Sequence, residues 1–165
     1  MRALDTLPPE LFAAAAAPWF EGAPRFLRRL AAARPFRDAA TLFGRADEIA
    51  AAMPEDEQVE LIDAHPRLGA PPATVSASSF REQGYDLETL AAMEDLARLN
   101  DAYESRFGFR FCVFVNGRSR PELVPVLEAA LDADRDAEIR RALRDVVAIA
   151  RDRFVKAQSP VGAAS

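Results

Sequence analysis

The sequence is poor in residues that bind metals or form disulfides, because its 165 residues include one histidine, His65, and one cysteine, Cys112. A single cysteine excludes an internal disulfide bond, and one histidine with one cysteine is too few for a typical zinc site. Cys112 lies in the apolar run FRFCVFV, which favours a small buried hydrophobic residue over a reactive thiol. We therefore expect no bound metal, and any imidazole chemistry must use His65.

The chain also lacks an excess of positive charge and any long apolar run. Its 26 acidic residues outnumber its 21 basic ones, and the net charge of −5 argues against nucleic acid or an anionic membrane as the main partner. No apolar stretch approaches the roughly 20 residues of a membrane span, and the start, MRALDTLPPE, has no apolar region typical of a secretory signal. We therefore expect a cytoplasmic protein that binds neither nucleic acid nor a membrane.

What the sequence does contain is a helical pattern. Alanine, leucine, arginine and glutamate dominate, apolar residues recur at spacings of three and four, and prolines mark the helix breaks. This pattern predicts an all-α fold: a single-domain irregular bundle of about seven or eight helices over residues 1–157, with a flexible tail at 158–165. The expected helices are 9–17, 24–33, 38–53, 54–64, 78–83, about 87–106, one from the cap at Ser119 to about Leu131, and 136–156.

The apolar spacing also predicts which side chains face the core. In the expected helices the inward residues are Phe26, Leu27, Leu30, Leu42, Phe43, Ile49, Ala50, Leu90, Met93, Leu96, Leu99 and Tyr103. Two charged clusters fit solvated helix surfaces: the arginines at 25, 28 and 29, and the acidic first turn at 55–57. The acidic turn could also hold Mg²⁺ loosely, although a solvated helix start is the simpler explanation.

Two segments are not expected to be helical. Residues 66–77, PRLGAPPATVSA, are rich in proline, glycine and small side chains, which predicts an irregular loop of the kind that often carries function. Residues 109–115 are aromatic and branched, but the chain offers too few other strands to build a sheet. We therefore interpret 109–115 as a buried connector, and Gly108 is expected to end the preceding helix.

His65 lies in the segment AHPRLG, at the point where a helix must stop. Proline disfavours the α conformation of the residue before it, so His65 should occupy a helix end with extended backbone. Such a histidine could serve as a proton donor and acceptor near neutral pH. It could equally cap the helix C-terminus, where a histidine interacts favourably with the last carbonyl groups.

A second polar group follows the loop, in the sequence SSFREQ. In a short helix Ser79, Glu82 and Gln83 lie three and four residues apart, so they share a face and could converge on one small polar ligand. The same spacing of Ser79 and Glu82 is that of a capping box, which opens many ordinary helices. Spacing alone leaves both interpretations open.

In their order along the chain these pieces resemble one family. AHPRLG, SSFREQ, LNDAYESRFGFRF and the closing helix RRALRDVVAIARDRF are similar to 2-oxo-4-hydroxy-4-carboxy-5-ureidoimidazoline (OHCU) decarboxylases, enzymes of urate degradation that yield (S)-allantoin. The resemblance covers nearly the whole chain. Its most specific part is the ordered set His-Pro, Ser-x-x-Glu-Gln and Asn-x-x-Tyr-x-x-Arg-Phe-Gly-Phe.

The resemblance implies a cofactor-independent carboxy-lyase that acts on a small-molecule substrate and forms a homodimer. It implies that His65 is the catalytic acid, with Glu82 also in a catalytic role. The residues implied to contact substrate are Pro66, Ser79, Phe80, Arg81, Glu82, Gln83, Phe111, Cys112, Val113, Phe114 and Val115. For 111–115 we expect backbone amides to be the donors, because these side chains offer almost no polar groups.

Loss of CO₂ from such a substrate leaves an enolate, which hydrogen-bond donors can stabilise without a metal or an organic electron sink. We expect His65 to protonate one face of the carbon, which would fix the S configuration.

The chain departs from the family pattern in two places. The loop between His65 and Ser79 is about three residues shorter than in animal-type members. Asn116 stands where many members have an arginine, whose guanidinium could bind the substrate carboxylate bidentately. Arg118 or Arg81 could replace that charge. The alternatives are a non-catalytic helical domain that binds a related ureido or hydantoin acid, or an enzyme for such an acid.

Overall fold

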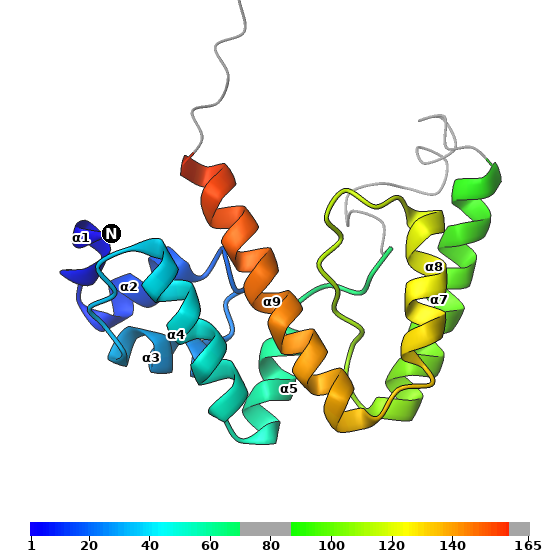
Figure 1. Cartoon of the computed structure of the whole chain (residues 1–165), viewed down its shortest axis with the longest axis horizontal. Coiled ribbons are helices and arrows are strands. Elements are labelled where there is room, and N and C mark those ends of the chain that lie inside the picture. The colour runs from blue at the N-terminus through cyan, green and yellow to red at the C-terminus, as the bar shows by residue number, and fades with distance from the viewer. Residues whose placement is uncertain (70–86, 159–165) are drawn as a thin grey trace, which may run out of the picture.

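The computed structural model describes residues 1–69 and 87–158. These residues form eight helices and no strand (Figure 1). The helices are α1 (Arg2–Asp5), α2 (Pro9–Ala16), α3 (Pro24–Ala32), α4 (Ala39–Ala52), α5 (Glu55–Asp63), α7 (Leu87–Phe107), α8 (Arg120–Ala130) and α9 (Arg135–Gln158). The all-α prediction is confirmed, and the bounds of α2 to α5 and α7 to α9 agree with the expected helices to within about two residues. The expected helix at 78–83 lies outside the described residues.

Helix α1 was not predicted, because four residues are too short to show apolar periodicity. Tertiary contacts hold it in place. The Asp5 carboxylate accepts hydrogen bonds from the backbone N–H groups of Phe36 and Arg37, at 3.0 and 3.1 Å. The Arg34 guanidinium donates to the carbonyl oxygen of Leu7.

The helix ends follow the signals in the sequence. Asp38 caps α4 by accepting a hydrogen bond from the Thr41 N–H at 2.7 Å, so it precedes the helix rather than belonging to it. The Glu122 carboxylate accepts from the Ser119 N–H at 2.8 Å at the start of α8. Gly108 follows α7 with a φ of +78°, a left-handed conformation that glycine adopts without steric strain.

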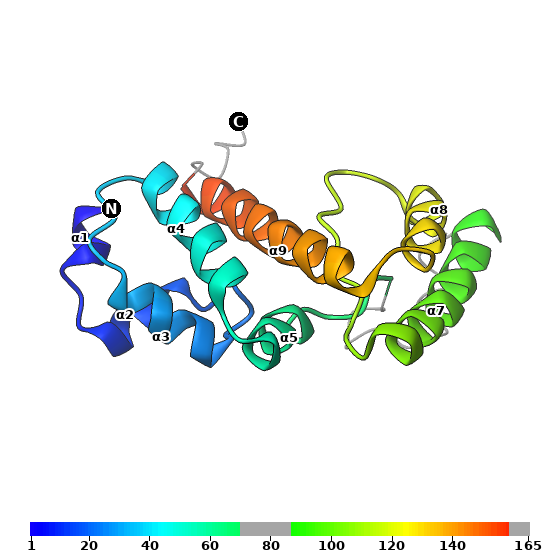
Figure 2. The same ribbon diagram turned by 60° about the horizontal axis from the view of Figure 1, so that its bottom comes forward.

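Helix α9 runs through the middle of the molecule (Figures 1 and 2). Helices α4 and α5 pack against it, and α2, α3 and α4 complete one end of the bundle. Helices α7 and α8 pack against each other at the opposite end. Residues 109–119, which include the predicted connector, run between α9 and the α7–α8 pair (Figure 1). No helix among the described residues is long and apolar enough to cross a membrane.

The core is aromatic and largely as predicted from the apolar spacing. Phe26, Leu30 and Tyr103 are fully buried, and the Tyr103 ring packs against the rings of Phe109 and Phe111. The expected inward residues Ile49, Leu90 and Met93 are only partly buried. The core predictions at the centres of the helix faces are confirmed.

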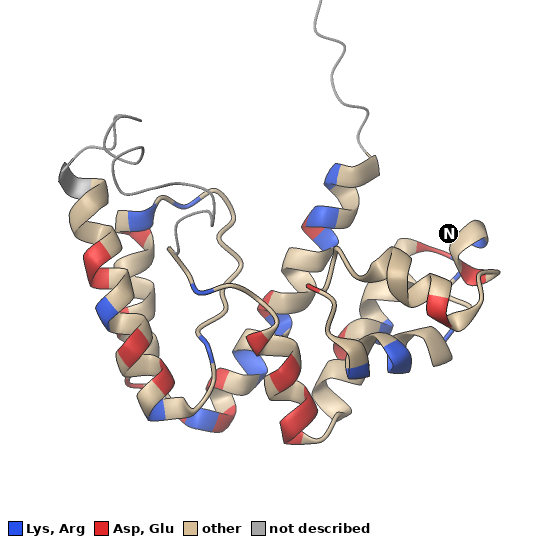
Figure 3. Cartoon of the chain, turned by 180° about the vertical axis from the view of Figure 1, so that it is seen from behind, with Lys and Arg blue, Asp and Glu red and all other residues tan. Residues whose placement is uncertain are grey.

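The two charged clusters are largely exposed, as expected, but most of their members also form ion pairs. Arg25 pairs with Glu60 and Asp56, and Arg29 with Glu57 at 2.6 Å, so α3 and α5 are joined by ion pairs. Figure 3 marks where basic and acidic residues lie along the ribbon. Glu55 contacts Arg135 at 2.8 Å at the start of α9. The clusters therefore lie on exposed surfaces as predicted, whereas the ion pairs were not predicted, since pairing across 28 or more positions is invisible to local sequence patterns.

Candidate active site

His65 follows Ala64, the C-cap residue of α5, and the next residue is a proline that cannot continue the helix. Its backbone N–H donates to the Ile62 carbonyl at 3.1 Å, and its side chain is buried, with the residue only 4% exposed. The ring atom Nδ1 lies 3.2 Å from the carbonyl oxygen of Leu61, in the last turn of α5. His65 therefore does cap the helix, as the simpler interpretation holds, but with one ring nitrogen only.

The other ring nitrogen, Nε2, is buried and has no hydrogen-bond partner among the described residues. A carbonyl oxygen only accepts hydrogen bonds, so Nδ1 must carry the proton and Nε2 of the neutral ring is left with its lone pair. Burial is the main cause that lowers the pKa of His65, and the contact with Leu61 opposes it. The ring is therefore neutral at pH 7, with a free acceptor at Nε2.

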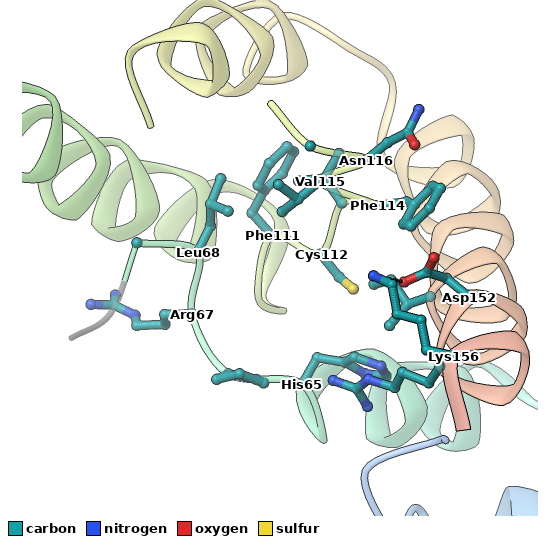
Figure 4. A pocket seen from close by; sticks show the side chains of 16 residues that line it. His65, Arg67, Leu68, Phe111, Cys112, Phe114, Val115, Asn116, Asp152 and Lys156 are labelled. Carbon is teal, nitrogen blue, oxygen red and sulfur yellow. Dashed lines mark ion pairs between the residues drawn. The ribbon is translucent and has the colours of Figure 1, made fainter. Parts of the chain in front are cut away.

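His65 opens onto a pocket of about 440 Å³ (Figure 4). The pocket has three sides: the chain after α5, the connector after α7, and one face of α9. The lining residues are His65, Pro66, Arg67, Leu68, Gly69, Phe111, Cys112, Val113, Phe114, Val115, Asn116, Gly117, Ile149, Asp152, Arg153 and Lys156. All the described residues that the sequence nominated for substrate contact thus line one cavity.

Residues 111–115 form one wall of this pocket, which we call the connector wall. Its first three side chains are buried, and burial raises the pKa of the Cys112 thiol to about 12, which keeps it protonated. Among the described residues, no backbone N–H of the connector wall donates a hydrogen bond. Amide donors beside a cavity that have no partner among the described residues can bind a ligand, which fits the expectation for this segment.

Asn116 follows the connector wall at the pocket rim. Its φ is +48°, a left-handed backbone conformation that asparagine tolerates better than most residues. Arg118, one of the two expected substitutes for a family arginine, does not line this pocket. Its guanidinium donates to the carbonyl oxygens of Phe114 at 2.6 Å and Val115 at 3.1 Å, so it is bound to the connector itself.

The third side of the pocket comes from α9 and was missed by the sequence analysis. Ile149, Asp152, Arg153 and Lys156 recur at spacings of three and four, so they share one helix face. Lys156 pairs with Asp152 at 2.6 Å. The spacing of these four residues can be seen in the sequence, but nothing in the sequence shows that this face of α9 turns toward His65.

Arg153 is held by the connection between α2 and α3. Its guanidinium donates to the carbonyl oxygens of Pro18 at 3.2 Å and Trp19 at 3.4 Å, and to the carboxylate of Glu21. Glu21 has a φ of +51°, a conformation that is rare for a residue with a side chain. The pocket therefore contains a cation whose direction is fixed by three acceptors.

Residues 79–83, which the sequence nominated for binding and catalysis, lie outside the described residues. The proximity of Ser79, Glu82 and Gln83 to His65 therefore stays a prediction. The replacement of the family arginine by Arg81 also stays a prediction. Arg67 points away from the pocket and pairs with Asp101 and Glu104, at 2.6 and 2.7 Å (Figure 4).

The described part of the chain is thus an all-helical protein with a small-molecule pocket built around one neutral, buried histidine. Its sequence matches the OHCU decarboxylase family over residues 5–155. The chain therefore belongs to the OHCU decarboxylase family, as its motifs led us to expect.

Individual relatives agree with this assignment. The chain is 35% identical to the uric acid degradation bifunctional protein PucL of Bacillus subtilis, over 82% of this chain but only 28% of that longer protein. It is 28% identical to a 2-oxo-4-hydroxy-4-carboxy-5-ureidoimidazoline decarboxylase of Haloferax volcanii, over 83% of each chain.

Solved structures show the same fold. An OHCU decarboxylase crystallised in the presence of (S)-allantoin superposes with a TM-score of 0.67 at 22% identity, over 84% of this chain and 93% of that one. A crystal structure of (S)-allantoin synthase gives the same TM-score at 20% identity, over 94% of this chain and 52% of that one.

Proposed function

We propose that this protein decarboxylates 2-oxo-4-hydroxy-4-carboxy-5-ureidoimidazoline to (S)-allantoin in urate degradation, without a metal or an organic cofactor. The observation that carries the proposal is the buried His65 ring, which lines the pocket and whose Nε2 has no hydrogen-bond partner among the described residues. The names of the relatives, which refer to OHCU decarboxylation and uric acid degradation, support the choice of substrate.

The state of His65 fits the proton transfer that this reaction requires. The reactant carries a hydroxyl and a carboxylate on one ring carbon, whereas allantoin has a carbonyl there and a new C–H bond on the neighbouring carbon. When CO₂ leaves, its bonding electrons stay on the ring, which takes up one proton from solvent. Neutral Nε2 can accept the proton of the hydroxyl group and, as the imidazolium, donate it to one face of the neighbouring carbon. His65 is then the acid that sets the S configuration.

Developing negative charge on the ring requires hydrogen-bond donors that are already in place. The N–H groups of the connector wall, which have no hydrogen-bond partner within 1–69 and 87–158, support this role. Ser79, Glu82 and Gln83 are proposed to orient the ring and the ureido group, together with Pro66, Phe80 and Arg81.

We assign the substrate carboxylate to Arg153. Asn116 brings no charge, and Arg118 does not line the pocket. Arg153 does line it, and because its guanidinium has five N–H donors, it keeps donors for a carboxylate beside those that bind Pro18, Trp19 and Glu21. Lys156 also lines the pocket and pairs with Asp152 at 2.6 Å, but an ammonium lacks the planar fork of a guanidinium.

The test is direct. Freshly generated 5-hydroxyisourate is passed through its hydrolase, the protein is added, and the optical activity of the allantoin is followed. We expect (S)-allantoin to form faster than in the spontaneous reaction. The His65→Ala variant should lose roughly 10²- to 10⁴-fold in turnover, the usual contribution of general acid–base catalysis, while its far-UV circular dichroism stays native.

Two results would refute the proposal. Wild-type turnover in His65→Ala would remove the histidine from the mechanism. Binding of allantoin by the wild-type protein without any acceleration of the reaction would instead identify a non-catalytic binding domain.

The homodimer and the cytoplasmic location are also proposals, and both rest on the family resemblance. Light scattering coupled to size-exclusion chromatography measures the oligomeric state. A mass of about 18 kDa, that of one chain, would contradict the dimer.

A further inference from the structure

The connector wall has no strand partner among the described residues, although its backbone is central to the proposed site. It separates two cavities. The site pocket lies on one side, and a second cavity of about 380 Å³ lies on the other, lined by residues of the wall, α8 and α9. An extended segment between two cavities is not positioned by a sheet ladder, so side chains must hold it.

Arg141 of α9 holds the wall from the side of the second cavity, which it lines. Its Nη1 donates to the carbonyl oxygen of Cys112 at 2.9 Å. Its guanidinium carbon lies 4.8 Å from the centroid of the Phe111 ring, in cation–π contact. One side chain therefore fixes both a peptide group and a ring of the wall.

Arg141 is itself fixed by two carboxylates of its own helix. Its Nε and Nη2 donate to Glu138 at 2.9 to 3.1 Å, and its Nη1 donates to Asp145 at 2.9 Å. Glu138 is buried at 4% exposure, which requires that its charge be paired.

The network continues into α7. The Tyr103 hydroxyl donates to Glu138 at 2.7 Å, and burial together with this contact raises the pKa of Tyr103, so the donor proton is retained. The Tyr103 ring packs edge-on against Phe111, with centroids 5.1 Å apart. Helices α7 and α9 thus hold the wall through one connected set of contacts.

The direction of the Cys112 carbonyl has a consequence for the pocket. In a trans peptide the C=O and the following N–H point to opposite sides. Because the Cys112 carbonyl points to Arg141, the N–H of Val113 points away from Arg141. That N–H has no hydrogen-bond partner among the described residues.

We propose that Arg141 is a positioning residue for the decarboxylation: by holding the Cys112 carbonyl, it aims the Val113 N–H at the oxygen that gains charge when CO₂ leaves. The proposal rests on the proposed function. Arg141 does not touch the substrate in this scheme; it acts through the peptide between Cys112 and Val113.

The principal variant is Arg141→Lys, which keeps a positive charge for Glu138 but loses the planar fork that reaches the wall. The matched control is Arg144→Met, an exposed arginine one turn along the same helix. We expect Arg141→Lys to lower kcat by about 10- to 100-fold, at or below the loss of a full oxyanion donor, with a smaller change in KM. The enantiomeric excess of (S)-allantoin should fall, whereas the acidic limb of the pH profile should stay in place.

A second readout does not depend on turnover. The rate at which a thiol reagent labels the buried Cys112, the one cysteine of the chain, should be higher in Arg141→Lys than in the wild type or in Arg144→Met. If the wild type fails to accelerate the reaction, the proposed function fails, and the labelling rate still decides whether Arg141 holds the wall.

Two outcomes would overturn the proposal: an Arg141→Lys enzyme within about twofold of wild type in kcat and stereoselectivity, or a loss of kcat in Arg144→Met equal to that in Arg141→Lys. If Arg141→Lys does not fold, the triple variant Glu138→Gln/Arg141→Met/Asp145→Asn, which removes all three charges of this network, takes its place with the same expected losses.

Discussion

Two facing sides of the pocket are held in place by different kinds of contact. His65 is held locally: α5 ends beside it, its Nδ1 contacts a carbonyl four residues earlier, and the next residue is proline. The connector wall is held at long range, by an arginine 29 positions away in sequence. The proposed proton-transfer group is therefore built from nearby residues, whereas the proposed amide donors depend on the packing of three distant segments.

Arg110 joins the two sides. Its backbone N–H donates to the Asp63 carboxylate at 2.7 Å, and its guanidinium donates to the carbonyl oxygens of Asp63 at 2.9 Å and His65 at 3.2 Å. The distance between imidazole and wall is therefore set by hydrogen bonds as well as by the core.

The largest expected effect comes from a variant that disrupts the long-range contacts of the connector wall. Glu138→Ala removes the buried partner of Arg141 and Tyr103, and we expect it to lower the free energy of unfolding by about 3 kcal/mol. This loss is at the low end of the range for breaking a buried ion pair, because the Arg141 side chain keeps 25% exposure. Urea denaturation measures the change, with the exposed Glu128→Ala as control. Equal stability of the two variants would show that the network does not support the wall.

The next effect concerns the α9 side of the pocket. Arg153→Met removes the proposed partner of the substrate carboxylate, and a hydrogen bond to a charged group contributes about 1.5–3 kcal/mol, so KM should rise by about 10- to 100-fold. Arg153→Lys keeps the charge without the fork and should recover part of the loss. Steady-state kinetics separate KM from kcat. An unchanged KM in Arg153→Met would assign the carboxylate to another group.

The smallest expected effect is the pH dependence set by His65, on the locally held side of the pocket. Because burial lowers the pKa of His65 below its ordinary value of about 6.5, and the neutral ring is the proposed acceptor, kcat/KM should be flat above pH 6.5 and fall only on further acidification. The same shift makes unfolding easier in acid, since below pH 6.5 the unfolded chain binds a proton that the buried ring does not. Profiles of kcat/KM between pH 5 and 8 test the predicted pH dependence of the rate. An inflection at or above pH 6.5 would contradict it.

Much of the fold followed from the sequence, for reasons that act over a few residues. Proline and glycine fixed the ends of α2, α3, α7 and α8, and apolar spacing placed Leu30, Leu96 and Tyr103 in the core. His65 was found because the chain has no other histidine and because Pro66 stops a helix there. The order of the motifs indicated the family.

The sequence by itself therefore determined the helices, their ends, and the one imidazole placed at a helix terminus, since propensity, capping and periodicity are local properties. Only the tertiary structure decided that α9 presents Arg153 to His65, that Arg118 binds the connector instead of the pocket, and that the arginines of α3 pair with α5. The reason is that each of these contacts selects among many possible partners of the same charge. That selection is made by the packing of helices far apart in the chain, which local patterns do not encode.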